Sequence, residues 1–470
     1  MKKLYISILF MATMLFSTSC GEEFLDLTPQ QSLADSDFLL TFDDFQVAII
    51  GGYDQMQNSD WYGRYVPLVA DVMGEDVKQN ASANRAKEWA EFNGNPTDFI
   101  PEEIWAELYE GINIANRMIN SSFEPPTAIA DDFNQIIGEA YALRGLAHFD
   151  LVKLFAQHYT FTADASHLGI PIVTEFDQTA KPTRNTVAEV YAQIISDFEM
   201  AEQLMTQDNG SGRFSREAVQ GLLSRVYLYM ENYAQAEAYA TQVINSGKYT
   251  LVSAADYPTQ FLDGNSSEAI FEIRFDLVDN PGSDHLGGMY KESGYGDYLP
   301  AEDLLNIIPD EDVRKTMFRE DLNLGGIYGT LRVDKFPSEG SVIGSDNIPV
   351  IRLSEVYLNR AEARAKAGND TGAQEDLNMI RQRGWADAPA VTATGDALVT
   401  EILNERRIEL SFEGHRIHDI VRNKMDVVRQ DCTSPVCTVT YPNARFILPI
   451  PVEETDVNPN ITQNPEYGTN

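Results

Sequence analysis

Residues 214–251 contain two amphipathic stripes separated by a short break, and this pattern restricts the fold more than any other part of the sequence. Ser215 can cap the first helix, and Gly247 can end the second in a left-handed conformation. Small side chains at Ser224 and Ala236 would allow the two helices to approach closely. A helix hairpin of about 34 residues is typical of a tetratricopeptide unit, which needs stacked neighbours to bury its apolar face. Apolar side chains recur at helical spacing at Ala218, Leu222, Val226, Tyr229, Ala236, Tyr239, Ala240 and Val243.

The same helical period recurs elsewhere in the chain. Thr186 and Glu189 form a capping box at the start of one such segment. Ala361, Gly368 and Ala373 occupy tetratricopeptide-like small positions in another. The sequence therefore predicts a mostly α-helical protein. The expected helices lie at 36–56, 101–119, 133–156, 186–204 and 397–410, with a second helix pair at 351–384.

The helical period is lost between residues 257 and 347. Residues 269–275 are strand-like, and the loop at 279–300 is rich in Gly and Tyr. Long loops in a compact protein are usually functional or disordered, and the aromatic content of this segment argues against disorder. The Pro- and Asn-rich segment 446–467 is expected to wrap the surface in extended form.

The charge of the chain narrows its possible partners. The sequence has 35 Lys and Arg against 72 Asp and Glu, a formal net charge of −37. A nucleic-acid-binding surface needs clustered Lys and Arg, and anionic lipid attracts basic segments. The composition therefore argues against nucleic-acid binding and against electrostatic adsorption to a membrane.

The N-terminus, residues 1–19, has the pattern of a secretory signal. Two lysines precede an apolar run at 4–16, and small residues stand directly before Cys20. The pattern resembles a bacterial lipobox, in which Cys20 is lipidated and becomes the mature N-terminus, although Ser17 stands where Leu is usual. Gly-Glu-Glu at 21–23 resembles a signal for the outer face of the outer membrane. We expect the lipid to be the only membrane attachment; the alternative is an ordinary signal peptide that leaves a free thiol.

A charged group near the C-terminal end could be interpreted as catalytic. Residues of alternating charge at such spacing usually form a structural ion-pair network, and we prefer that interpretation. His415, His418 and Asp419 lack further ligands at metal-binding spacing. Because the common hydrolase, metalloprotease and nucleotide-binding motifs are also missing from the sequence, we expect no catalysis, cofactor or metal. The charged group consists of Glu405, Arg406, Arg407, Glu409, Glu413 and Arg416.

Cys432 and Cys437 are the only cysteines besides Cys20. In a secreted chain whose third cysteine carries lipid, a disulfide closing this short loop is the simplest interpretation. A metal site with two cysteines would lack ligands.

Several aromatic residues lie in loops with Gly, Asp and Asn neighbours rather than at helical spacing. A flat ring suits the C–H face of a pyranose, and nearby carboxylates such as Glu292 and Asp297 can accept hydrogen bonds from sugar hydroxyls. Each of these rings can also pack in the core. The expected ligand-binding residues are Trp61, Tyr62, Trp89, Tyr290, Tyr295, Asp297 and Tyr298, with Tyr65 as a further loop aromatic.

The order and spacing of several motifs resemble the SusD/RagB family of outer-membrane lipoproteins, and the resemblance covers the chain from end to end. The motifs are Cys20 with Phe24-Leu25-Asp26 and Pro29; Ile351-Arg352-Leu353-Ser354-Glu355-Val356-Tyr357-Leu358 with Ala361-Glu362; Leu377-Asn378-Met379-Ile380-Arg381; Glu405-Arg406-Arg407 with Phe412-Glu413-Gly414-His415-Arg416; and Leu448-Pro449-Ile450-Pro451 with Asn458-Pro459-Asn460 and Gln463-Asn464-Pro465.

This resemblance implies a SusD-like fold, mostly α, in which about four tetratricopeptide-like helix pairs scaffold an irregular half with short strands. It implies a lipidated tether at 20–35, an N-terminal region at 36–256 and a RagB/SusD C-terminal region at 257–470. It also implies a cell-surface protein that binds oligosaccharide and delivers it to a SusC-type TonB-dependent transporter as its lid. Two alternatives remain. One is a RagB-type binder of peptide or protein, and the other is a surface glycoside hydrolase, which would need two carboxylates about 5–10 Å apart.

Overall fold

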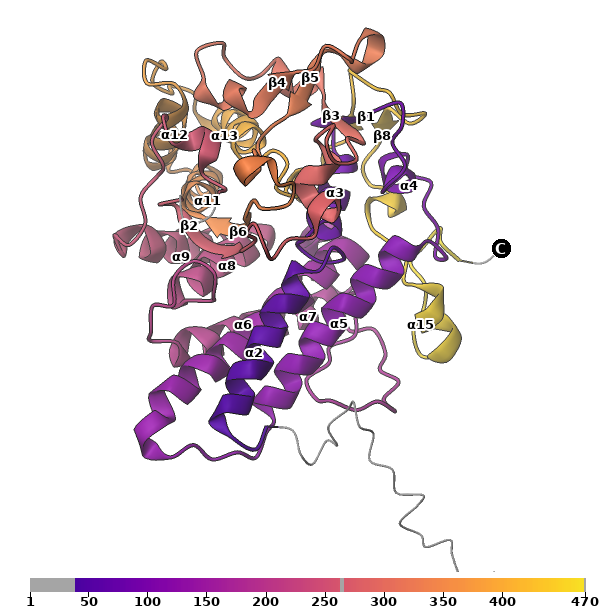
Figure 1. Cartoon of the computed structure of the whole chain (residues 1–470), viewed down its shortest axis with the longest axis vertical. Coiled ribbons are helices and arrows are strands. Elements are labelled where there is room, and N and C mark those ends of the chain that lie inside the picture. The colour runs from indigo at the N-terminus through magenta and orange to yellow at the C-terminus, as the bar shows by residue number, and fades with distance from the viewer. Residues whose placement is uncertain (1–38, 263–265, 469–470) are drawn as a thin grey trace, which may run out of the picture.

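The computed structural model describes residues 39–262 and 266–468, so the expected signal peptide, Cys20 and the tether lie outside the described residues. Helices are the main regular structure of the molecule. The strands β1, β3, β4, β5 and β8 lie at the end opposite α2, α5 and α6, and β2 and β6 lie nearer the middle, beside α8 and α11 (Figure 1). The long helices are α2 (Phe42–Gln57), α5 (Phe99–Ile119), α6 (Ala130–Phe155), α7 (Val187–Leu204), α8 (Arg216–Tyr229), α9 (Tyr233–Asn245), α11 (Leu353–Lys366), α12 (Asp370–Gly384) and α13 (Gly395–Glu409). The shorter ones are α3 (Tyr65–Val72), α4 (Lys87–Ala90), α10 (Glu302–Leu305), α14 (Arg416–Arg422) and α15 (Val452–Val457).

The long helices pack as stacked antiparallel pairs, which confirms the mostly α-helical fold predicted from the sequence. α5 packs on α6, α8 on α9, and α11 on α12. α11 also packs directly on α8 and α9, although residues 257–347 separate them in the chain. The hairpin at 214–251 therefore finds its stacked neighbour in the pair at 351–384, and the irregular segment is looped out between them.

Within the 214–251 hairpin, the predicted caps are present. Ser215 accepts a hydrogen bond from the backbone N–H of Ala218 at 3.1 Å, and Gly247 has φ +65°. Ala236 is fully buried, but Ser224 faces the next pair, where its Oγ accepts a hydrogen bond from Asn359 Nδ2 at 3.1 Å. Small side chains thus serve the contact between pairs as well as the contact within the hairpin.

Some element boundaries differ from the prediction. α2 begins at Phe42 rather than at residue 36, because Thr41 and Asp44 form a capping box there. The sequence reading missed α3, which is buried on all sides and therefore has no amphipathic stripe. The C-terminal segment is not wholly extended, since residues 452–457 form α15.

The strands form four two-stranded antiparallel sheets within the described residues. β2 pairs with β6 where the strand-like segment was expected, and β6 leads directly into α11. The strands are β1 (Val77–Gln79), β2 (Ala269–Ile273), β3 (Tyr298–Pro300), β4 (Phe318–Glu320), β5 (Leu331–Val333), β6 (Ile348–Arg352), β7 (Val427–Val428) and β8 (Thr438–Val439). Their partners are β1 with β3, β2 with β6, β4 with β5 and β7 with β8.

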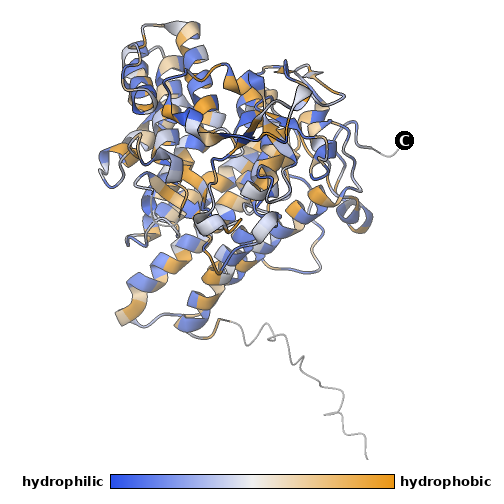
Figure 2. Ribbon diagram, turned by 45° about the horizontal axis from the view of Figure 1, so that its top comes forward, coloured by the Kyte–Doolittle hydropathy of each residue, from blue (hydrophilic) through white to orange (hydrophobic). Residues whose placement is uncertain are grey.

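The helices carry hydrophobic and hydrophilic residues on different faces (Figure 2), as amphipathic helices around a shared core require. In the part of the chain that the structure describes, no helix combines the length and the apolar character needed to span a bilayer. A disulfide joins Cys432 to Cys437 with their Cα atoms 5.7 Å apart. Its loop is attached to β1, because the Thr433 hydroxyl donates to the Gln79 carbonyl at 2.7 Å.

Candidate functional site

Most of the loop aromatics expected to bind ligand are buried, so in this structure their faces are covered by protein. Trp61, Tyr62, Trp89, Tyr290 and Tyr298 are all at most 6% exposed. The glycines near them allow close packing rather than exposure: a Cβ on Gly94 would lie 2.4 Å from the Trp89 ring, and one on Gly111 would lie 2.8 Å from the Trp61 ring.

The polar atoms of the buried rings support this interpretation. Trp61 Nε1 donates to Asp150 at 3.0 Å, and the Tyr290 hydroxyl donates to Asp71 at 3.2 Å. The Tyr298 hydroxyl donates to the Arg85 carbonyl at 2.6 Å. Buried rings with partnered polar atoms are typical of a core, so Trp61, Tyr290 and Tyr298 support the surface above them. Trp89 differs, because its buried Nε1 has no hydrogen-bond partner among the described residues.

Tyr295 is the exception among the predicted tyrosines, since its side chain is partly exposed. The guanidinium of Arg85 lies over the ring, 3.1 Å from its centroid. The Tyr295 hydroxyl donates to Asp284 Oδ1 at 3.1 Å, and the same oxygen pairs with Arg64 Nη1 at 2.5 Å. A ring, two cationic groups and a carboxylate therefore meet at one place.

Asp297 lies beneath this place and is 2% exposed. It accepts hydrogen bonds from Arg85 Nη1 at 3.2 Å and from the backbone N–H of Arg85 at 3.1 Å. The structure thus gives Asp297 the role of holding Arg85 over Tyr295, rather than that of an acceptor open to a ligand. Glu292, the other expected acceptor, is exposed and pairs with Arg319 at 2.5 Å.

An exposed phenylalanine extends this surface. Phe99 is 53% exposed and packs edge-on against Tyr65, with 5.7 Å between ring centroids. The Arg64 guanidinium lies 4.1 Å from the centroid of the Tyr65 ring. The turn before α3, the loop between β1 and α4, the start of α5 and the 279–300 loop therefore contribute to one continuous region. We call this region the Tyr295 surface, and it consists of Arg64, Arg85, Phe99, Asp284 and Tyr295.

Two neighbouring carboxylates, Asp60 beside Arg64 and Glu107 beside Asp60, have raised pKa values. Partial burial, with the nearby Asp60 charge, raises the pKa of Glu107 to about 7, against the opposing hydrogen bond from Asn58 Nδ2 at 3.1 Å. Burial also raises the pKa of Asp60, with Arg64 opposing the shift and Asp284 adding to it. Glu107 therefore changes charge near neutral pH.

The charged group near the C-terminal end forms ion pairs, in agreement with the structural interpretation. Glu409 pairs with Arg314 at 3.0 Å, Arg352 at 2.6 Å and Arg383 at 2.5 Å. Burial alone would raise the pKa of Glu409, but these three arginines hold it well below its usual range. The other five members also pair: Glu405 with Arg314, Arg406 with Asp419, Arg407 with Asp76, Glu413 with Arg352, and Arg416 with Glu75.

His415 and His418 lie in the interior beside this network. Burial holds the pKa of each well below its usual range, so both imidazoles are neutral. Among the described residues, no group of three or more His, Cys, Asp or Glu side chains is placed to hold a metal ion.

Trp385 was missed in the sequence reading, although it follows Gly384 and precedes Ala386 and Asp387, the same kind of neighbours used to select the other loop aromatics. It is partly exposed, whereas Trp61, Trp89 and Trp105 are buried. The sequence neighbours of an aromatic residue did not determine the exposure of its ring, because exposure depends on which distant segments of the chain pack over the ring.

Comparison with known proteins relates the chain to one group. Residues 325–467 match a model described as the SusD family, and residues 23–228 match one described as starch-binding and associating with the outer membrane. A SusD superfamily structure from Bacteroides thetaiotaomicron superposes with a TM-score of 0.84 at 32% identity, covering 91% of this chain and 100% of that one. SusD-like protein P38 of Formosa agariphila is 26% identical over 99% of both chains. The starch-binding protein SusD of Bacteroides thetaiotaomicron is 31% identical over 29% of this chain and 24% of its own length.

Proposed function

Because the chain belongs to the SusD family, we propose that it binds an oligosaccharide at the cell surface and delivers it to a SusC-type TonB-dependent transporter. The family descriptions refer to starch binding and to association with the outer membrane. They describe binding proteins rather than enzymes, which favours capture of a glycan over its hydrolysis.

The observation that carries the proposal is the arrangement of Tyr295, Arg85 and Asp284. The stacked ring and guanidinium form a flat surface, the guanidinium offers several N–H donors, and the carboxylate offers acceptors. Sugars present apolar C–H faces and hydroxyls that donate and accept, so they match this combination. Asp297 and the buried Tyr298 hold Arg85 from below, so contacts within the protein fix its position.

The transporter and the membrane anchor complete the proposal. We propose that lipidated Cys20 anchors the protein to the outer membrane, with the folded part outside the cell. In this account the helix pairs form the scaffold that contacts the transporter, and the irregular half holds the ligand loops. The protein would then close over the transporter as a lid once a glycan is bound.

Isothermal titration calorimetry of the purified full chain tests ligand binding. The probes are maltoheptaose, cellohexaose, xylohexaose and laminarihexaose, with tetra-alanine and tetra-lysine as peptide comparisons. We expect at least one glycan to bind and the peptides not to bind. Binding of a peptide alone would support the RagB-type alternative, and release of shorter sugars during the titration would support a hydrolase.

A further inference from the structure

A pocket of about 540 Å³ lies between α12, α13 and two loops, away from the residues of the Tyr295 surface. Its volume is in the range of ligand sites, about 300–1,000 Å³. The residues that line it come from 307–314, from 381 and 385–392, and from 401–408. None of them belongs to the Tyr295 surface, so the two places are built independently.

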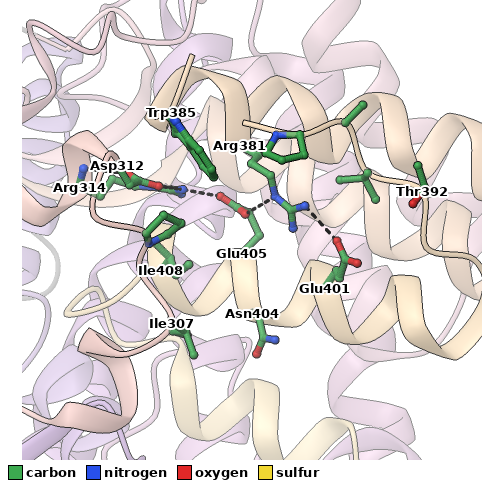
Figure 3. A pocket seen from close by; sticks show the side chains of 14 residues that line it. Ile307, Asp312, Arg314, Arg381, Trp385, Thr392, Glu401, Asn404, Glu405 and Ile408 are labelled. Atoms are coloured by element: carbon green, nitrogen blue, oxygen red, sulfur yellow. Dashed lines mark hydrogen bonds and ion pairs between the residues drawn. The ribbon is translucent and has the colours of Figure 1, made fainter. Parts of the chain in front are cut away.

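The ring of Trp385 forms part of the pocket wall, and Arg381 lies beside it (Figure 3). Gly384, directly before Trp385, permits the close approach of Arg314, because a Cβ there would lie 2.9 Å from the Arg314 guanidinium. The following loop is tied to α12: the backbone N–H of Val391 donates to Asn378 Oδ1 at 3.0 Å, and Gln374 Nε2 donates to the Ala393 carbonyl at 2.8 Å. The wall is thus held in place by the protein itself.

A chain of ion pairs crosses the pocket (Figure 3). Arg381 donates to Glu401 at 3.0 Å and to Glu405 at 3.3 Å, and Glu405 pairs with Arg314 at 2.6 Å. Each arginine is therefore already neutralised by carboxylates, which leaves no free cation for an anionic ligand. Arg381 and Glu401 keep 23% and 37% of their side-chain surface exposed, so both can still reach a neutral ligand.

Further polar groups at the pocket remain available. Asn404 and Thr392 are exposed, and within the described residues their side chains form no hydrogen bond. The Trp385 ring offers an apolar face in the same pocket (Figure 3). An aromatic face with amide, hydroxyl and paired charged groups suits a polyhydroxylated ring better than an ion or a wholly apolar molecule.

We infer that this pocket is a second binding site, which takes a neutral saccharide with one pyranose ring against Trp385. This inference extends the proposed glycan binding to a second place on the same chain. The two sites share no residue, so each would bind its glycan segment independently of the other.

Trp385 provides its own reporter, because the other three tryptophans are buried. The experiment follows tryptophan emission of the purified full chain during titration with maltoheptaose and the other three glycans. We expect at least one glycan to shift the emission with a saturating curve, and Trp385→Phe to lose this response. Asn404→Ala retains Trp385 and should raise the glycan concentration at the midpoint about five-fold, the equivalent of one hydrogen bond of about 1 kcal/mol. Tyr295→Ala should leave this midpoint unchanged.

Calorimetry on the same samples separates this inference from the proposed function. Heat of binding without any emission change in the wild-type protein would overturn the pocket inference and leave glycan binding intact. A midpoint that Tyr295→Ala shifts but Asn404→Ala does not would also overturn it. Neither heat nor emission change with any glycan would overturn both, and an emission change with tetra-lysine alone would overturn the saccharide class.

Discussion

Asp297 Oδ2 accepts a hydrogen bond from Arg85 Nη1 at 3.2 Å, and the guanidinium that makes this bond lies 3.1 Å from the centroid of the Tyr295 ring. Asp297 is buried, whereas the Arg85 side chain is 28% exposed. The buried carboxylate of Asp297 thus holds the guanidinium of Arg85 at the surface. The guanidinium in turn holds the ring of Tyr295 in its orientation.

Changing Asp297 to Asn should weaken glycan binding without unfolding the protein. The amide can still accept from the backbone N–H groups of the Arg85 loop, but it loses the charge that attracts the guanidinium. We expect a several-fold weaker affinity by calorimetry. Glu292→Gln, on the same loop, is the control and should bind like the wild type. Equal affinities for wild type and Asp297→Asn would show that Arg85 needs no such support.

The pairing of α8 and α9 predicts a large difference between two alanines on one helix. Ala236 is fully buried in α9, whereas Ala238 is exposed. Ala236→Leu should overpack the hairpin and lower the free energy of unfolding by about 1–3 kcal/mol. Ala238→Leu should change it by less than about 0.5 kcal/mol. Urea unfolding measures both, and equal stabilities would contradict the observed packing.

Glu107 predicts a pH dependence of stability. Its pKa is about 7 in the folded protein, mainly because of burial, and about 4.3 in an unfolded chain. The unfolded chain therefore releases this proton at lower pH, so the group destabilises the protein progressively between about pH 4 and pH 7 and fully above that range. Glu107→Gln should raise Tm relative to wild type at pH 8 and leave it unchanged at pH 4. The exposed Glu124→Gln is the control. A Tm gain at pH 4 equal to that at pH 8 would rule out ionisation as the cause.

The proposed lipid anchor predicts that Cys20 is the only acylated residue. Replacing Cys20 with Ala should abolish incorporation of radiolabelled palmitate in cells and release the protein from the membrane fraction. Cys432→Ala is a matched control that should remain labelled. Palmitate labelling that persists in the Cys20 variant would contradict the anchor.

The helical scaffold could be predicted from the sequence because its elements repeat a period. Apolar stripes and the Thr186–Glu189 capping box mark α7 to α9, and the structure confirms them. α3 could not be found this way, since a helix buried on every side has no stripe.

The candidate site was predicted less well, because exposure is a tertiary property. Gly94 lies against Trp89 from five residues away in the chain, but Gly111 lies against Trp61 from α5, fifty residues away. A glycine beside an aromatic ring in the sequence therefore predicts that another group approaches the ring closely. It does not indicate whether that group belongs to the protein or to a ligand. Tyr295 and Trp385 have the same kind of sequence neighbours as the buried rings. They differ from those rings only in that less of the folded chain covers them.

The most direct test of the proposed site compares two tyrosines by calorimetry with the glycan that binds wild type most tightly. Tyr295 lies on the proposed ligand surface, and Tyr239 stacks on Tyr227 in the helical scaffold, with 5.6 Å between ring centroids. Stacking on one ring contributes about 0.5–1.5 kcal/mol beyond burial. Tyr295→Ala should therefore weaken binding at this surface several-fold, Tyr295→Ala with Arg85→Ala should nearly abolish binding there and leave only the heat of the Trp385 pocket, and Tyr239→Ala should bind like wild type. Unchanged binding by the Tyr295 variants together with lost binding by Tyr239→Ala would place the ligand on the helical scaffold and contradict the account.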